Sequence, residues 1–141
     1  MIRKVFLDTS YVIALSSLGD RFHESALHLA NELESSQVEL VTSYAILLEI
    51  GNALSKRRFR PAALALLRAL RADPKVRIAN FSIELFDEAL KLFSLRADKD
   101  WGLIDCMSFV IMSKEGITQA LTTDDHFRQA GFEPLMKRVS P

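Results

Sequence analysis

The sequence predicts an α/β fold in which helices flank a short, mostly parallel central sheet. Short apolar runs containing Val, Ile or Phe are typical of buried strands, and they alternate with longer segments whose apolar residues recur at helical spacing. The chain has 141 residues and 49% hydrophobic content, with no repeat, low-complexity tract or Gly/Ser/Pro-rich linker. We therefore expect one domain, residues 1–141, with a sizeable core.

The first half of the chain contains two runs typical of strands and four helical segments. Gly19 and Asp20 separate the first two helices, Thr42 or Ser43 can cap the third, and Pro61 begins the fourth. The expected elements are strand 4–7, helices 10–15 and 21–34, strand 38–41, and helices 44–56 and 61–71.

Turn and capping residues divide the second half in the same way. Asp73 and Pro74 form a turn, Ser82 opens a helix, and Gly116 and Gly131 are suited to helix ends. The expected elements are strand 76–79, helix 82–95, polar loop 98–100, helix 103–115, strand 120–123, short helix 126–130 and a last strand 135–139.

Charge and cysteine content limit the classes of protein to consider. The 18 Lys and Arg residues balance the 18 Asp and Glu residues, so any nucleic-acid contact must come from a local basic patch. The single cysteine, Cys106, cannot form an intrachain disulfide. Asp8 ends the first apolar run before it reaches the length of a signal-peptide core or a membrane span. We expect a soluble, cytoplasmic protein.

Four acidic residues lie inside apolar segments or at their edges, where free charge is unusual. Asp8 and Asp124 directly follow predicted strands, and in a parallel sheet both reach the edge where ligands bind. Glu49 lies within a predicted helix, and Asp105 lies near the start of another. Hard oxygen ligands of this kind suit Mg²⁺ or Mn²⁺. The pattern predicts one shared metal site.

Each acid also has an ordinary structural explanation. Asp8 can cap the helix that follows it, and Asp124 or Asp125 can cap the short helix near position 126. Asp105 can favour a helix N-terminus through the helix dipole, and Glu49 can pair with a nearby basic residue. These explanations require a separate cause for each of the four acids, whereas a single metal site explains all four.

One basic segment is a candidate for phosphate contacts. Lys56, Arg57, Arg58 and Arg60 surround Phe59, whose ring is able to stack on a base. The alternative is a solvated helix end without a partner.

Four short motifs resemble those of a known family. They are FLDTS at 6–10, LEI at 48–50, LIDCMS at 103–108 and LTTDDHF at 121–127. In this order and at this spacing they resemble the PIN-domain ribonucleases, and most of all the VapC-type toxins of toxin–antitoxin pairs. The resemblance extends over essentially the whole chain. It implies a PIN-like three-layer sandwich.

The resemblance also implies a function and a site. Asp8, Glu49, Asp105 and Asp124 would form the acidic metal site for Mg²⁺ or Mn²⁺. Thr9 or Ser10 would add a hydroxyl that orients Asp8 or a metal-bound water. The protein would be a metal-dependent endoribonuclease that hydrolyses RNA phosphodiester bonds, and it would form a homodimer and bind a cognate antitoxin protein.

The residues support specific roles in such chemistry. Without bound cations the acids would repel an anionic phosphodiester, whereas a bound metal attracts it and activates water. Asp8 and Asp105 are expected to coordinate most directly, Asp124 directly or through water, and Glu49 to position or deprotonate the attacking water. Some relatives carry a further acid near the last corner.

In this chain His126 follows at that corner. A second metal is therefore less expected there, and His126 would contact phosphate or lie on the surface.

Three other functions remain open from the sequence. The same fold would serve a housekeeping RNA-processing nuclease, or a non-catalytic module that binds metal or protein. A phosphatase with a nucleophilic aspartate would be expected to have a second Asp at position 10, where Ser10 stands. A neighbouring gene for a small DNA-binding protein would favour the toxin.

Overall fold

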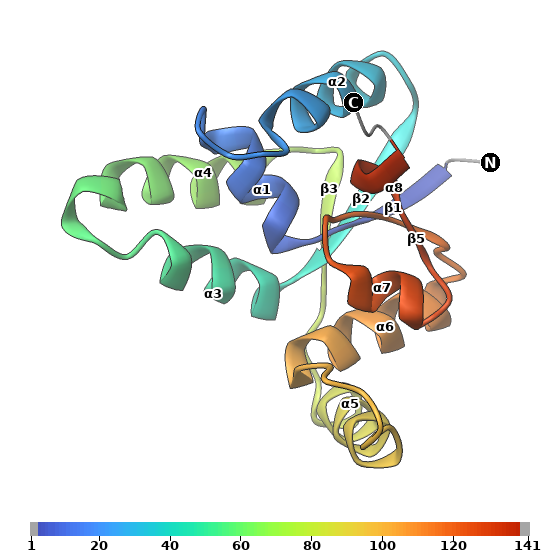
Figure 1. Cartoon of the computed structure of the whole chain (residues 1–141). Helices are drawn as coiled ribbons and strands as arrows, with labels where there is room; N and C mark the ends of the chain where they lie inside the picture. The colour runs from blue at the N-terminus through green and yellow to red at the C-terminus, as the bar shows by residue number, and fades with distance from the viewer. Residues whose placement is uncertain (1–2, 139–141) are drawn as a thin grey trace.

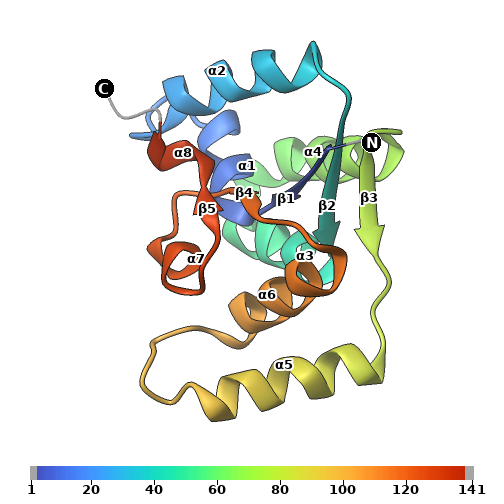
Figure 2. The ribbon, with the colours of Figure 1, turned by 90° about the vertical axis from the view of Figure 1, so that its right-hand side faces the viewer.

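A five-stranded parallel sheet is the centre of the computed structural model, which describes residues 3–138. The strand order is β3-β2-β1-β4-β5, and every neighbouring pair is parallel. Figure 2 shows β1, β2 and β3 side by side. The strands are β1 Arg3–Leu7, β2 Val38–Ser43, β3 Val76–Ala79, β4 Gln119–Leu121 and β5 Glu133–Pro134. The predicted α/β class is confirmed.

The helices form two groups around this sheet (Figure 1). In the first group α1 packs on both α2 and α3, and α3 packs on α4; α5, α6 and α7 form the second group. Their bounds are α1 Thr9–Ser16, α2 His23–Glu34, α3 Tyr44–Ala53, α4 Arg60–Ala72, α5 Ile83–Leu95, α6 Leu103–Glu115, α7 Asp125–Gln129 and α8 Leu135–Arg138. Within residues 3–138, no helix has the length and apolar character needed to cross a bilayer.

Local capping explains where several helices begin and end. Ser43 accepts a hydrogen bond from the backbone N of Ile46 at 3.2 Å, and Ser82 accepts one from Leu85 at 3.0 Å. Gly116, with a φ of 67°, ends α6 in the left-handed region that favours glycine. The caps predicted at these three positions are confirmed.

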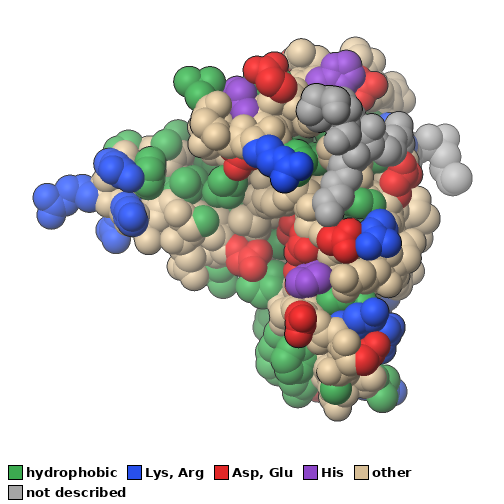
Figure 3. All heavy atoms as spheres, in the orientation of Figure 1, with side chains coloured by type: hydrophobic (Ala, Val, Ile, Leu, Met, Phe, Trp, Pro, Cys, Tyr) green, Lys and Arg blue, Asp and Glu red, His purple; other side chains and the backbone are tan. Residues whose placement is uncertain are grey.

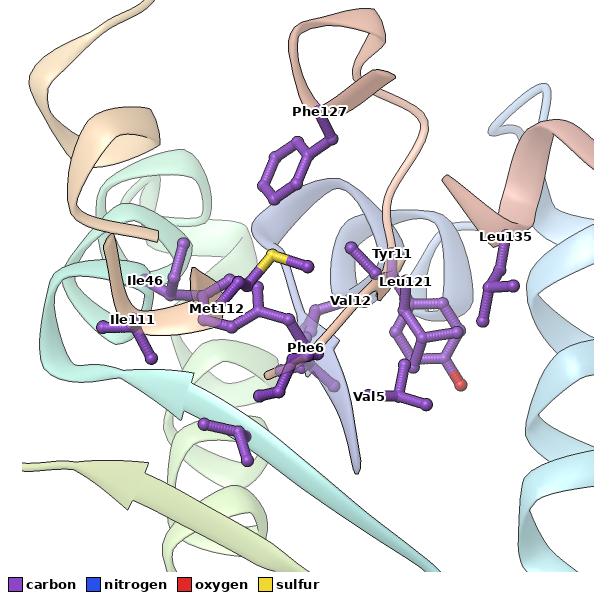
Figure 4. Packing of buried hydrophobic residues seen from close by; sticks show 14 of the residues in the cluster. Val5, Phe6, Tyr11, Val12, Ile46, Ile111, Met112, Leu121, Phe127 and Leu135 are labelled. Atoms are coloured by element: carbon purple, nitrogen blue, oxygen red, sulfur yellow. The ribbon is translucent and has the colours of Figure 1, made fainter. Parts of the chain in front are cut away.

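The core lies on both sides of β1 (Figure 4). Val5, Phe6 and Leu7 are buried, which explains why this strand is a continuous apolar run rather than an alternating one. The rings of Phe6 and Phe127 lie 6.2 Å apart, so the short helix α7 is anchored in the same core. This packing fixes the ends of β1 and β4 relative to each other.

The prediction of a last strand over 135–139 is wrong. The strand β5 contains only Glu133 and Pro134, and the chain then forms α8. Proline has no N–H to continue a strand ladder. Leu135 and Met136 of α8 are both buried in the core, where α8 contacts β4 and α2. Position 139 lies outside the described residues.

The segment after α3 also differs from the prediction. The helix ends at Ala53 instead of continuing to position 56, and a 3₁₀ turn, η1 Arg57–Phe59, leads into α4. Leu54, the residue after the helix, leaves the helical region with φ −110° and ψ 29°, and Lys56 is extended before the 3₁₀ turn, with φ −60° and ψ 145°. The apolar periodicity of the sequence does not encode this break.

Helix α5 buries only part of its apolar surface. Leu85 and Ala89 are buried, whereas Ile83, Leu90 and Phe93 are 68%, 45% and 46% exposed. These three exposed side chains recur at intervals of seven and three residues, so they lie along one side of the helix. We call them the α5 apolar face.

Candidate metal centre

The four predicted acids meet at the carboxyl edge of the sheet. Asp8 directly follows β1, Asp124 follows β4, Glu49 projects from α3 and Asp105 lies in the first turn of α6. They line one open pocket of about 370 Å³, and its other lining residues are Thr9, Ser10, Asn52 and Ala53. The convergence permitted by the strand order is therefore present in the structure.

Asp8 is the most deeply buried acid of the pocket, with 7% of its surface exposed. Its Oδ2 accepts hydrogen bonds from Thr122 Oγ1 at 2.7 Å and from Ser10 Oγ at 3.1 Å. Burial raises the pKa of Asp8 to about 6 although these hydrogen bonds lower it, and the charge of Glu49 raises it further. The protein alone therefore stabilises this negative charge poorly.

Thr122 connects the two central strand ends. Its hydroxyl is fully buried, donates to Asp8 and accepts from the backbone N of Asp124 at 2.9 Å. Ser10 Oγ lies 3.1 Å from this hydroxyl and accepts from the backbone N of Thr123 at 3.0 Å. The sequence interpretation missed Thr122, although it is a polar residue between a buried strand and a candidate ligand.

Glu49 is held by the other predicted hydroxyl. Thr9 Oγ1 donates to Glu49 Oε1 at 2.7 Å, while Ser10 is the residue that contacts Asp8. Asn52 lines the same pocket and was not predicted. It lies three residues after Glu49 on α3, so helical spacing was a signal that would have found it.

Asp105, Asp124 and His126 form a compact corner of the site. His126 Nδ1 lies 3.2 Å from Asp105 Oδ2 and 3.4 Å from Asp124 Oδ1. Burial raises the pKa of Asp105, and the charge of Asp124 also raises it, although Gly102 and His126 oppose the shift. The expectation that His126 lies on the surface or meets phosphate did not include this contact.

The explanation of the acids as helix caps holds for two of the acids and not for Asp8. Asp8 precedes α1 but makes no side-chain capping bond to it. Asp124 Oδ1 accepts from the backbone N of His126 at 2.9 Å, and Asp105 Oδ2 accepts from that of Gly102 at 3.0 Å, so these two acids do satisfy helix termini. Among the described side chains of residues 3–136, no salt bridge involves Glu49.

The pocket has the chemistry of a divalent cation site. No Lys or Arg stands among the described residues that line it, so its acids lack a fixed counter-charge there. One carboxylate oxygen each from Asp105 and Asp124 and one nitrogen of His126 all lie within 4.8 Å of one another. Buried and half-buried carboxylates without a Lys or Arg partner are suitable donors for a hard divalent ion.

The predicted basic segment lies outside this pocket. Lys56, Arg57, Arg58 and Arg60 are exposed at the turn between α3 and α4. Arg60 Nε donates to the carbonyl of Ser55 at 2.7 Å. Figure 3 shows this Lys and Arg cluster at the far left of the molecule, away from the central acidic patch.

Comparisons with known proteins agree over most of the chain. The model of the PIN domain family matches residues 5–133. The 23S rRNA-specific endonuclease VapC20 of Mycobacterium tuberculosis, from strains CDC 1551 / Oshkosh and ATCC 25618 / H37Rv, is 31% identical over 128 residues, which are 91% of this chain and 95% of VapC20. The crystal structure of M. tuberculosis VapC20, described as a Sarcin-Ricin loop cleaving toxin, superposes with a TM-score of 0.81 at 30% identity, covering 91% of this chain and 95% of that one.

Proposed function

This chain belongs to the PIN-domain family and resembles the VapC endonucleases in sequence and fold, and from that premise we propose that it is a Mg²⁺- or Mn²⁺-dependent endoribonuclease. The observation that carries the proposal is the convergence of Asp8, Glu49, Asp105 and Asp124 on one pocket that no Lys or Arg lines within the described chain. Such a pocket repels RNA when it is empty and suits RNA hydrolysis once a cation is bound.

The four acids would divide the work according to their environments. Burial raises the pKa of Asp8 and of Asp105, so a bound cation would stabilise the charged form of these two carboxylates most. We therefore assign them as its direct ligands. Asp124 would bind directly or through water. When bound, the cation would supply the positive charge that attracts the phosphodiester and stabilises the charge developing on it.

Glu49 is the residue we assign to the attacking water. Its Oε1 is fixed by Thr9, so the carboxylate has a defined position at the mouth of the pocket. From there it would orient the water and accept its proton as the phosphodiester bond breaks. The hydroxyls of Ser10 and Thr122 would hold Asp8 in place during the same step.

The substrate we propose is RNA, and ribosomal RNA is the first substrate to test because VapC20 is named for 23S rRNA. The exposed segment Lys56 to Arg60 would contact phosphates away from the cleaved bond. We expect the protein to act as a toxin in the cytoplasm, controlled by a cognate antitoxin protein.

We also propose that the chain forms a homodimer through the α5 apolar face. Ile83, Leu90 and Phe93 are exposed together on one helix, and Figure 3 shows apolar side chains gathered along the left side of α5. Sedimentation equilibrium tests this, with a dimer expected for the wild type and a monomer for Ile83→Lys/Leu90→Lys. A monomeric wild type at tens of micromolar would contradict it.

Cleavage of ribosomal RNA by the purified protein tests the nuclease proposal. We expect cleavage in Mg²⁺ or Mn²⁺, none in excess chelator, and a loss on the order of 10²-fold or more in Asp8→Asn and Asp105→Asn. The matched control is Asp87→Asn, which removes an exposed acid from α5. Cleavage that persists in chelator, or in both site variants, would sink the proposal.

A further inference from the structure

His126 is the one described basic side chain that forms an ion pair with the acids of the metal centre. Its Nδ1 faces two carboxylates at once, at 3.2 Å from Asp105 Oδ2 and 3.4 Å from Asp124 Oδ1. The three side chains are between 20% and 34% exposed, so the corner is open to ions from solvent. One carboxylate would be enough for an ion pair with His126, so the second contact calls for another explanation.

The backbone determines the position of His126. Its N–H donates to Asp124 Oδ1 at 2.9 Å at the start of α7, and the next residue, Phe127, is fully buried in the core. On the other side, Asp105 Oδ2 is fixed by the backbone N of Gly102 at 3.0 Å. The two oxygens and the nitrogen are therefore preorganised before any ligand arrives.

The distances from His126 Nδ1 to the two carboxylate oxygens fit one six-coordinate ion. Neighbouring ligands about 2.1 to 2.2 Å from an octahedral ion lie about 3 Å from each other. The two distances from Nδ1, 3.2 and 3.4 Å, need to change by only a few tenths of an ångström to reach that value. A bound ion would thus replace the direct contact between His126 and the carboxylates.

We propose, on the basis of the proposed metal-dependent function, that His126 is a nitrogen ligand of this centre and shifts its preference from Mg²⁺ toward Mn²⁺. Mg²⁺ prefers oxygen ligands and gives up its waters reluctantly, whereas transition-metal ions accept imidazole readily. The four predicted acids offer only oxygen, so His126 sets the selectivity of the centre.

Electron paramagnetic resonance of Mn²⁺ bound to the untagged protein tests this assignment directly. We expect pulsed spectra of the wild type to show coupling to ¹⁴N of an imidazole. The coupling should vanish in His126→Asn and persist in His28→Asn, which removes an exposed histidine of α2. Thermal unfolding of each variant checks that it is folded. If His126→Asn does not fold, the wild-type spectrum alone still shows whether an imidazole nitrogen binds the ion.

Competition between Mn²⁺ and Mg²⁺ gives the second readout. We expect the Mn²⁺ affinity to fall about tenfold in His126→Asn, with less than about a twofold change for Mg²⁺. Bound Mn²⁺ without nitrogen coupling, or an equal loss for both ions, would overturn the role of His126 and leave the metal-dependent nuclease standing. A wild type that binds neither ion would overturn both proposals.

Discussion

Asp8 carries a charge in a place where the folded protein barely tolerates it. The side chain is 7% exposed, and its stabilising hydrogen bonds from Thr122 and Ser10 do not compensate for the loss of water around it. The buried charge lowers the stability of the folded protein. A cation would stabilise this carboxylate more than it would stabilise a solvated one, so the stability lost serves metal binding. This loss can be measured as a dependence of stability on pH.

In chelator, Asp8→Asn is expected to be more stable than the wild type at pH 7.5. The pKa of Asp8 is 3.8 in the unfolded chain and about 6 in the folded protein. The folded state therefore binds more protons between these values, and the wild type loses stability as the pH rises from about 4 to about 6. Urea unfolding should show a gap of up to about 3 kcal/mol at pH 7.5.

The gap between Asp8→Asn and the wild type should close below about pH 3, where Asp8 is protonated in both states. Asp87→Asn serves as the control, because an exposed acid should give no such pH-dependent gap. Lower stability of Asp8→Asn at pH 7.5 would show that burial of the charge is not the dominant effect.

Thr122→Val is expected to weaken metal binding more than it weakens the fold. The change deletes the hydroxyl that holds Asp8 Oδ2 and accepts from the backbone N of Asp124. Loss of such an outer partner usually costs 10-fold to 100-fold in metal affinity or activity. Isothermal titration with Mn²⁺ and the cleavage rate are the two measurements, and Thr122→Ser should restore both.

Thr42→Val is the matched control for Thr122→Val. Thr42 is equally buried, and its hydroxyl donates to the backbone carbonyl of Leu7 at 2.9 Å instead of to a carboxylate. Both variants should lose about 1 to 2 kcal/mol of stability, while Thr42→Val keeps its metal affinity. If both variants lost the same amount of Mn²⁺ affinity, the role of Thr122 in metal binding would be contradicted.

The four acids were predictable because each one is improbable in its own segment. A carboxylate next to buried apolar residues violates the usual sorting of charge, and two of the four follow strands that share one edge. Thr122 and Asn52 are polar residues that many surfaces and turns also contain, so their roles depend on tertiary contacts that spacing alone does not reveal.

At the scale of elements, the turn between α3 and α4 is a separate basic unit. Its side chains project from η1 at the far end of the two helices, and Arg58 stacks 4.7 Å over the ring of Phe59. The pocket acids and this turn are joined through α3, which carries Glu49 near its middle. Substitutions in the turn would therefore test the proposed RNA contacts separately from the proposed cleavage site.

Arg57→Ala/Arg58→Ala is expected to raise KM about tenfold and to leave kcat nearly unchanged, because these side chains would bind RNA only through phosphates. The slope of log affinity against log salt concentration should become shallower by about 0.7 for each phosphate of single-stranded RNA that the variant no longer neutralises. Cleavage kinetics and RNA binding measured over a range of salt concentrations check both values.

The control for the basic turn is Arg21→Ala/Lys91→Ala. It removes the same charge and includes a comparable stack, since Arg21 lies 5.0 Å over Phe22. Its KM should stay at the wild-type value. A fall in kcat in Arg57→Ala/Arg58→Ala, or an equal rise of KM in the control, would contradict the role of the turn.

Element types were more predictable than element ends. Short apolar runs identified β1 and β3, and a longer, largely apolar segment that ends at Gly116 identified α6. The sequence pattern failed at 135–138, where two adjacent buried residues fit either element and only the docking of α8 onto the core decides. The end of α3 likewise depends on the backbone at Leu54, which no side-chain pattern marks.

At the scale of the whole molecule, the sheet has two chemically different edges. The carboxyl edge gathers acids without basic partners from Lys or Arg, whereas the amino edge carries a paired network. In this network Glu115 at the end of α6 bonds to Lys4 of β1 and Arg77 of β3, and Arg77 also bonds to Glu39 of β2. Ion pairs neutralise the charges at the amino edge, whereas the acids at the carboxyl edge have no Lys or Arg partner.

Glu115→Gln is expected to lower stability by about 1 kcal/mol at pH 7, because a partly exposed ion-pair network contributes little more. Burial raises the pKa of Glu115, but hydrogen bonds from Arg77 and Lys4 outweigh it and hold the pKa below its ordinary value of 4.5. Its stabilisation is therefore present above pH 4.5 and is lost as the pH falls through the lowered value.

Urea unfolding between pH 3 and pH 7 measures this difference for Glu115→Gln. Glu88→Gln is the control, since Glu88 pairs with Lys114 on an exposed surface and should contribute less. A loss that grows as the pH falls would contradict the assignment of Glu115 to the network.

The route of the chain through the sheet has a consequence in time. β1, which delivers Asp8, is synthesised first, and β4, which delivers Thr122 and Asp124, pairs directly with it only after the intervening strands and helices have been made. Domains fold as the ribosome extends them, so an unfinished chain contains the first acid of the pocket without the last. The proposed metal centre is therefore incomplete until the segment that contains β4 and Asp124 has been synthesised.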